Sequence, residues 1–198
     1  MAMMEIYALD LDELTAVVGS GDRTLLRTIS VELEGHLAVA DEEFGDRIAE
    51  GAPTRLDAIR AVIDGGPFDD RYGYQYGYAY HNLCVYHGLR QNNLNFAPFR
   101  HDWLETVDEG LRRLGLTAVT VSTFRHNRPP SPLPYTTEPT YGEWSPAQCR
   151  EAFDQWRAST IEQRAALGYD LREAVESCAE WLRAATSGNG LGIAAFSF

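Results

Sequence analysis

Gly188-Asn189-Gly190-Leu191-Gly192-Ile193-Ala194-Ala195-Phe196, close to the end of the chain, is the stretch that decides the predicted fold. Its first three residues form a tight turn after a helical pattern. The apolar run Leu191 to Phe196 that follows is typical of a β-strand buried on both faces. Because a single strand is not stable by itself, this run predicts that other segments of the chain pair with it in a sheet.

Two other segments have the pattern of strands and are the expected partners. One is Glu5–Leu9 near the start of the chain, and the other is Thr117–Phe124 in the centre, which alternates in polarity and is rich in β-branched residues. Pairing of all three strands ties both ends of the chain to its centre. We therefore expect an α+β fold: a mainly helical single domain over residues 1–198, with a small sheet formed by strands from the N-terminus, the centre and the C-terminus.

Helix caps and apolar stripes predict a brief first helix, Asp10 to Gly19, and about seven helices after it. Their expected starts or ranges are from about Asp22, Asp41–Ile48, Thr54 to Gly65, Tyr74–His87, His101–Leu114, from Ser145 and from Asp170. Six of the nine prolines fall between Pro129 and Pro146. We expect this region to form a proline-rich loop at about 127–146: a functional loop, an ordered strap over the surface or, as the alternative, a domain linker.

The composition excludes several classes of reaction. All 17 basic residues are arginine, because the chain contains no lysine. Without lysine there is no Walker-type phosphate loop, no Schiff base with pyridoxal phosphate or a carbonyl substrate, and no kinase-type nucleotide lysine. The chain also lacks a Ser/His/Asp or HExxH signature that would indicate a hydrolase. We expect no bound cofactor.

The charge of the chain limits its partners and its location. The 29 acidic residues give a formal net charge of -12 and a pI near 4.8. Such a charge argues against binding of a phosphate backbone, so we expect no nucleic-acid partner. The apolar runs are far shorter than the roughly 18 residues that span a bilayer, and the start of the chain lacks a secretion signal. We expect an acidic, cytoplasmic protein with no membrane partner.

The three cysteines do not indicate a disulfide framework. They are odd in number, contain no CxxC pair and occur in a chain that is expected to be cytoplasmic. Cys149 and Cys178 lie on the apolar stripes of two predicted helices, so both are expected to be buried as small hydrophobic residues.

One region of the chain concentrates reactive side chains. On the predicted helix, His81 and Cys84 are neighbours at i, i+3, and His87 lies a further turn along the same flank. His101 begins the next helix, which could return towards them. Together, His81, Cys84, His87 and His101 could hold a zinc ion or activate Cys84 by a histidine. The alternative is that Cys84 is a core residue and His87 complements the C-terminal dipole of its helix.

A second candidate site is a cluster of tyrosine and arginine residues. Tyrosine occupies every even position from 72 to 80, and five tyrosines in nine residues cannot all face the core from one helix. Tyrosine and arginine also dominate recognition hot spots. The candidate binding residues are Tyr74, Tyr76, Tyr78, Arg71, Arg90 and Arg100, joined by Arg125 and His126, which could bind an anion or pair with acidic residues of the chain itself. The alternative is an aromatic satellite core whose hydroxyls reach the surface.

Several motifs resemble those of an uncharacterised family of actinobacterial proteins. They are 7–14 (YALDLDEL), 19–22 (GSGD), 64–68 (DGGPF), 75–78 (QYGY) and the closing helix, glycine and strand. The order of elements, with a helix start at 141–146 (YGEWSP), is more loosely similar to the YfbM-like family of unknown function. The resemblance implies a single α+β fold, and it carries over no activity and no catalytic residue.

Two functional hypotheses follow from these patterns. The first is a non-catalytic, cytoplasmic module that binds another protein with a basic surface, as a toxin-neutralising immunity-type protein does. The second is an enzyme, or a protein that binds a small molecule or a metal, using His81, Cys84, His87 and His101. The sequence leaves the reaction, the substrate, the partner and the oligomeric state undetermined.

Overall fold

The chain divides into two compact units, each of which is described by itself. The structure is a computed structural model that describes residues 2–100, 102–126, 128–188 and 190–198. We call the first the sheet unit, which comprises Met1–Leu11, Gly88–Asn127 and Thr140–Phe198. We call the second the helical unit, which comprises Asp12–His87 and Arg128–Pro139. Helices and one small antiparallel sheet together confirm the predicted α+β class.

The sheet has four antiparallel strands in the order β2-β1-β4-β3. Their bounds are β1 (Met4–Leu9), β2 (Leu89–Arg90), β3 (Thr140–Trp144) and β4 (Gly192–Ser197). The strands from the two ends of the chain pair over their full length, from Met4 with Ser197 to Leu9 with Gly192. All six residues of β4 are buried, as its unbroken apolar run predicts. The terminal strands are therefore confirmed as the centre of the sheet.

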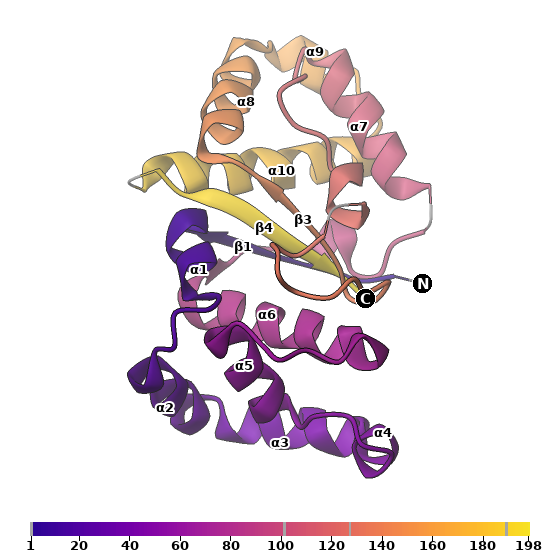
Figure 1. Cartoon of the computed structure of the whole chain (residues 1–198). Coiled ribbons are helices and arrows are strands. Elements are labelled where there is room, and N and C mark those ends of the chain that lie inside the picture. Colours follow the sequence, from indigo (N-terminus) through magenta and orange to yellow (C-terminus); the bar gives the residue numbers. More distant parts are fainter. Residues whose placement is uncertain (1, 101, 127, 189) are drawn as a thin grey trace. The chain divides into compact units, whose positions relative to one another are not determined.

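Helices of the sheet unit cover one face of the sheet (Figure 1). They are α7 (Trp103–Arg113), α8 (Pro146–Ala158), α9 (Ile161–Ala165) and α10 (Tyr169–Ser187), and the short 3-10 turns are η2 (Leu94–Phe96) and η3 (Ser122–Arg125). α10 contacts β1 and β4, and both α7 and α8 contact α10. The core between them contains Trp144 and Trp181, whose ring centroids are 6.1 Å apart. Cys149 and Cys178 are buried in the same core, as predicted.

The predicted central strand Thr117–Phe124 is wrong. This segment is an irregular loop followed by η3, and the strands that the middle part of the chain contributes are β2 and β3, at the two edges of the sheet. Side chains satisfy its backbone in place of a neighbouring strand: the Asp108 carboxylate accepts the N–H groups of Val121 and Ser122, and the Gln155 side chain accepts that of Thr117 at 2.8 Å. The alternating pattern reflects the burial of Val119 and Val121, not pairing in a sheet.

Removal of the buried Asp108 carboxylate is expected to weaken the sheet unit. Asp108→Ala leaves the Val121 and Ser122 N–H groups without acceptors, which lowers the free energy of unfolding by about 2 kcal/mol. Urea denaturation monitored by tryptophan fluorescence measures this loss. The control is Glu109→Ala, which removes an exposed carboxylate paired only with Arg112 and should change stability by less than about 0.5 kcal/mol. Equal effects of the two substitutions would contradict this role of Asp108.

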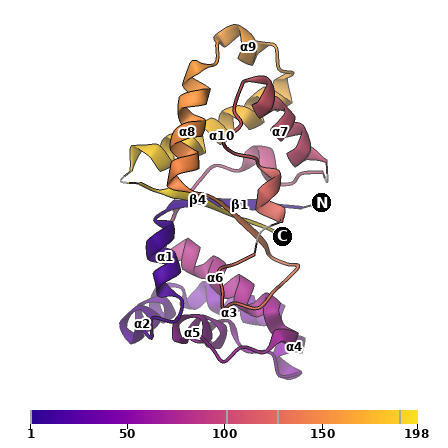
Figure 2. The same cartoon turned by 45° about the horizontal axis from the view of Figure 1, so that its top comes forward.

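The helical unit consists of helices that pack around α5 (Figure 2). Their bounds are α1 (Leu11–Val17, whose first residue belongs to the sheet unit), α2 (Arg23–Glu32), α3 (Glu34–Glu43), α4 (Gly45–Ala49), α5 (Arg55–Asp64), the 3-10 turn η1 (Asp70–Tyr72) and α6 (Gly73–His87). α5 contacts α6, α2 and α3. The predicted helix Tyr74–His87 is confirmed, whereas the predicted helix Asp41–Ile48 is interrupted at Phe44, where α3 ends and α4 begins.

The proline-rich loop expected at about 127–146 is two different structures. Asn127 lies outside the described residues, and the last part of the loop is β3 and the start of α8. The remainder, Arg128–Pro139, belongs to the helical unit, and we call it the proline strap. It packs on α6 where two glycines leave room: a Cβ at Gly73 would lie 2.5 Å from the Tyr135 carbonyl oxygen, and one at Gly77 would lie 2.9 Å from Thr136 Cγ2.

Candidate functional site

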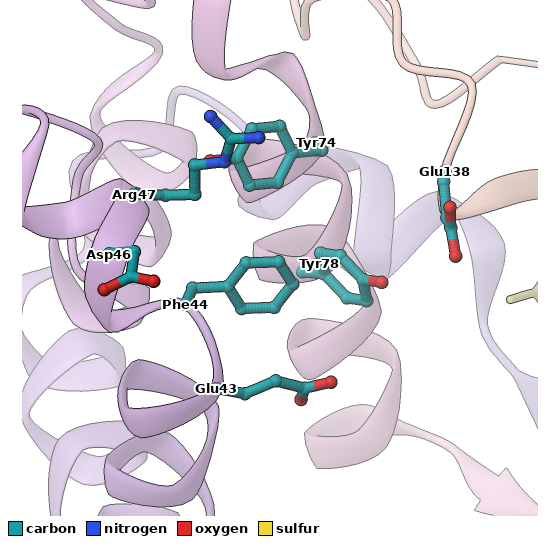
Figure 3. A pocket seen from close by; sticks show the side chains of 7 residues that line it. All are labelled: Glu43, Phe44, Asp46, Arg47, Tyr74, Tyr78 and Glu138. Atoms are coloured by element: carbon teal, nitrogen blue, oxygen red, sulfur yellow. The ribbon is translucent and has the colours of Figure 1, made fainter.

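The helical unit contains a pocket of about 530 Å³ between α3, α4, α6 and the proline strap (Figure 3). We call it the acidic aromatic pocket. It is lined by Glu43, Phe44, Asp46, Arg47, Tyr74, Tyr78 and Glu138. These residues come from three separate parts of the chain, which only the folded unit brings together.

Three aromatic rings form the wall of the pocket. Tyr74 and Tyr78 are four residues apart on α6, so they lie on one face of the helix. The Phe44 ring lies against both, with centroid distances of 5.6 Å to Tyr74 and 5.4 Å to Tyr78 (Figure 3). The break between α3 and α4 at Phe44 places its side chain against α6. All three side chains are half-buried, so they pack together and still face the pocket.

A buried arginine lies against these rings. Arg55, the first residue of α5, is only 2% exposed, and its guanidinium carbon is 4.5 Å from the Tyr78 ring centroid and 5.4 Å from that of Phe44. Its backbone N–H donates to the Asp41 carboxylate at 2.7 Å, which joins the start of α5 to α3. Its Nε is buried without a hydrogen-bond partner among the described residues.

Burial lowers the pKa of Arg55 from its usual value to about 10. Loss of hydration is the main cause, and the nearby Tyr78, Asp41 and Glu43 oppose it. Arg55 therefore stays charged at neutral pH. Its position in the first turn of α5 also places a cation at the positive end of the helix dipole, which is unfavourable.

The mouth of the pocket carries unpaired negative charge. Glu43, Asp46 and Glu138 are exposed and come from α3, α4 and the proline strap. Within the part of the chain that the structure describes, none of the three forms an ion pair with an arginine or histidine. The only basic side chain of the lining, Arg47, is paired with Glu50 at 3.1 Å. The pocket thus combines aromatic walls with an excess of carboxylates.

The tyrosine hydroxyls of the pocket remain protonated at neutral pH. Burial raises the pKa of both Tyr74 and Tyr78. The Tyr74 hydroxyl is buried and has no hydrogen-bond partner within the described ranges. A protonated phenol can either donate or accept a hydrogen bond, and this buried hydroxyl does neither with the described residues.

The predicted binding residues of the helical unit do not all reach this pocket. Tyr74 and Tyr78 line it, whereas Tyr76 points elsewhere: it is 4% exposed, packs edge-on against Phe68 and accepts the Asp69 N–H through its hydroxyl at 3.1 Å. Arg71 is exposed in η1, before α6 begins, and is paired with Asp69 at 2.6 Å. Of this group, the structure therefore brings only two tyrosines into one site.

The other predicted binding residues belong to the sheet unit. Arg90, on β2, pairs with Glu5 at 2.6 Å. Arg100 and His126 are exposed, and Arg125 is half-buried in η3. Their role in binding stays a prediction.

The predicted metal site is only partly described. His81 and Cys84 are buried on α6, and His87 at its end is half-buried, with Nδ1 3.8 Å from the Glu13 carboxylate. His101 lies outside the described residues. Within the described residues, which include His81, Cys84 and His87, no three His, Cys, Asp or Glu side chains are grouped so that they could hold a metal ion. The predicted site with His101 stays a prediction.

The three thiols are expected to react slowly in the native protein. Cys84, Cys149 and Cys178 are buried thiols, and burial raises the pKa of Cys149 to about 12 and that of Cys178 well above its usual value. Only the thiolate attacks a disulfide reagent. We therefore expect that a chromogenic disulfide at pH 8 labels fewer than about one in ten of the native thiols in the time in which it labels all three thiols of the denatured protein. Rapid labelling of Cys84 would favour the catalytic alternative.

Sequence reasoning missed most of the pocket. Asp41-Glu42-Glu43 has the composition of a solvated helix face, and nothing in the local sequence indicates that Glu138 lies near it. Arg55 follows a helix cap and has the pattern of a surface residue. The one available signal was Phe44, a single aromatic residue within an acidic segment.

Comparison with known proteins identifies the family of this chain. A family described as a domain of unknown function, DUF7691, matches residues 2–197. The chain belongs to the DUF7691 family. This agrees with the predicted membership of an uncharacterised family, while the resemblance to actinobacterial and YfbM-like proteins stays a prediction. No curated protein and no solved structure matches this DUF7691 chain. Over the residues described, no helix is both long and apolar enough to cross a membrane.

Proposed function

We propose that this DUF7691 protein is a non-catalytic, cytoplasmic module that binds a partner protein with a basic surface. The observation that carries the proposal is the acidic aromatic pocket, in which three unpaired carboxylates surround half-buried aromatic rings. Tyrosine supplies a large contact area and a polar end, and carboxylates supply complementarity to a basic surface. A toxin that acts on nucleic acid is a basic protein of this kind, so an immunity-type role is the specific form of the proposal.

The distribution of charge between the units supports the same function. The helical unit contains 15 of the 29 acidic residues and 7 of the 17 arginines, which is -8 of the net charge of -12. It also contains 7 of the 10 tyrosines. Negative charge and aromatic residues are thus concentrated in the unit that holds the pocket. A field of this sign accelerates encounter with a basic partner and becomes weaker as salt is added.

The experiment that tests the proposal starts from the protein made by its own cells. The chain is isolated after chemical crosslinking, and native mass spectrometry identifies what is bound to it. The partner is then purified, and its affinity for the chain is measured at 50 and 500 mM salt. We expect a basic protein whose affinity falls at least about 10-fold between these salt concentrations. An acidic partner, or binding that does not depend on salt, contradicts the proposal.

Two triple variants with the same change of charge locate the binding surface. Glu43→Gln/Asp46→Asn/Glu138→Gln neutralises the pocket, and Glu105→Gln/Glu109→Gln/Glu151→Gln neutralises three exposed carboxylates of the sheet unit. We expect about 10-fold weaker binding of the partner by the first variant and less than about 3-fold by the second. Equal effects would show that net charge alone attracts the partner, and that the pocket is not the contact. For the immunity-type role, co-expression with the partner should restore growth that the partner alone inhibits.

A further inference from the structure

We infer that the acidic aromatic pocket receives the cationic end of a lysine or arginine side chain that the partner inserts. This inference rests on the proposed function, because it names the chemical group that the site recognises. It commits the pocket to an ammonium or guanidinium group and not to an anion or a neutral apolar side chain. Three features support this occupant: the aromatic rings of the pocket, its carboxylates and the buried Arg55.

The aromatic wall is suited to a cation. Phe44, Tyr74 and Tyr78 pack at centroid distances of 5.4–5.6 Å, yet each side chain remains half-buried and faces the pocket. Ring faces attract ammonium and guanidinium groups, and the aliphatic part of a lysine or arginine side chain packs on the same rings. The pocket of about 530 Å³ has room for one such side chain.

The polar groups of the pocket match a cation that carries N–H donors. Glu43, Asp46 and Glu138 are exposed acceptors from three different elements. Arg47, the basic residue of the lining, is paired with Glu50, so the lining keeps an excess of carboxylates. An ammonium group has three donors and a guanidinium group has five, so either can satisfy several of these acceptors at once.

Arg55 distinguishes a cationic occupant from an anionic one. Its charge lies against the inner side of the wall, 4.5 Å from the Tyr78 ring centroid, where Asp41 and Glu43 partly balance it. An anion would be drawn to Arg55, but it would have to pass the three carboxylates at the mouth. A cation in the pocket is attracted by those carboxylates and repelled by Arg55 through the wall. Removal of the Arg55 charge therefore strengthens the binding of a cation and weakens the binding of an anion.

Small capped amino acids test the pocket without the partner. The full chain is titrated with N-acetylarginine methylamide and N-acetyllysine methylamide, followed by NMR, and N-acetylcitrulline methylamide is the uncharged control. We expect millimolar binding of the two cationic probes, and at least about 5-fold weaker binding of the citrulline probe. Equal binding of the arginine and citrulline probes would overturn the inference.

Variants then assign the binding to the pocket. Asp46→Asn and Glu138→Gln should each weaken the cationic probes about 2- to 5-fold, while Glu42→Gln, an exposed neighbour on α3 that does not line the pocket, leaves them unchanged. Arg55→Met should tighten the cationic probes by about 10-fold, because it removes a positive charge behind the wall and keeps the length of the side chain. Weaker cation binding by Arg55→Met, together with binding of propionate by the unchanged chain, would overturn the inference in favour of an anion.

The two proposals fail in different ways. If a basic partner binds in a salt-dependent manner but the cationic probes do not bind, the proposed function stands and the inserted side chain is wrong. If the probes bind in the pocket and no basic partner is found, the pocket recognises a cation and the proposed function is wrong. A structure of the complex with a lysine or arginine of the partner outside the pocket would also overturn the inference.

Discussion

Gly142→Ala is expected to lower the free energy of unfolding by about 4 kcal/mol or more, the largest loss among the substitutions considered for this chain. Gly142 is the middle residue of β3, and η3 passes directly over it. A Cβ there would lie 2.5 Å from Phe124 Cα, 2.6 Å from the Thr123 carbonyl oxygen and 2.9 Å from the Phe124 backbone nitrogen. All three neighbours are backbone atoms, so no side chain can rotate away, and either β3 or η3 has to leave its place.

Urea denaturation of the variant also tests whether the two units form one domain. All four tryptophans lie in the sheet unit, so tryptophan fluorescence follows that unit alone, whereas far-ultraviolet circular dichroism follows the helices of both. We propose a single domain, because the chain passes between the units at 11/12, 87/88, 127/128 and 139/140. The two signals should then shift together in Gly142→Ala. A fluorescence midpoint that falls while a separate dichroism transition stays in place would show two independently folding domains.

The control for this substitution is Gly168→Ala in the same unit. A Cβ at Gly168 meets no atom within 4 Å, and its φ of -61° suits any residue. Its loss should be below about 1 kcal/mol, since alanine is only a poorer N-cap for α10 than glycine. If Gly142→Ala were as mild as Gly168→Ala, η3 would not be held against β3.

The elements that could be predicted from the sequence are those whose pattern lies within one segment of the chain. The strands β1 and β4 could be predicted because an apolar run with no polar face is buried wherever it lies, and α6 could be predicted because its spacing fits one helix. The segment Thr117–Phe124 could not, because its N–H groups are satisfied by Asp108 and Gln155, residues of two other helices. A pattern of buried and exposed residues does not reveal where a backbone finds its hydrogen bonds.

The site shows the same limit more strongly. The sequence predicts that some tyrosines of this helix lie outside the core, because they cannot all face it, and Tyr74 and Tyr78 do line the pocket. Their partners Glu43 and Glu138 lie 31 and 64 residues away from Tyr74 along the chain, and each has the pattern of an ordinary exposed carboxylate. The two carboxylates belong to the pocket because of their position around the rings. That position depends on the break between α3 and α4 at Phe44 and on the packing of the proline strap against Gly73 and Gly77.

Arg55→Met is expected to raise the free energy of unfolding by about 1–4 kcal/mol, although most substitutions of buried residues lower it. Arg55 is buried without a carboxylate within ion-pair distance in the described chain. Burial lowers its pKa to about 10, which corresponds to a penalty of about 3 kcal/mol for its charge. Methionine has a similar length, packs well on aromatic rings and carries no charge to desolvate. Part of the gain is offset by the lost attraction between the guanidinium and the rings of Phe44 and Tyr78.

The pH dependence of this gain has a defined sign. Because the pKa of Arg55 is lower in the folded state than in the unfolded state, the penalty is present in full below about pH 10 and decreases only as pH rises above about 10. Urea denaturation followed by circular dichroism should therefore give the same difference between the variant and the unchanged chain at every pH from 5 to 9. The matched control is Arg60→Met on the same helix, where the arginine is exposed and paired with Asp57, and the change should be below about 0.5 kcal/mol. A loss of stability in Arg55→Met would show that Arg55 is a structural anchor. A gain in stability would show that the charge of Arg55 destabilises the fold next to the aromatic rings. A destabilising residue of this kind is typical of one that is kept for function and not for folding.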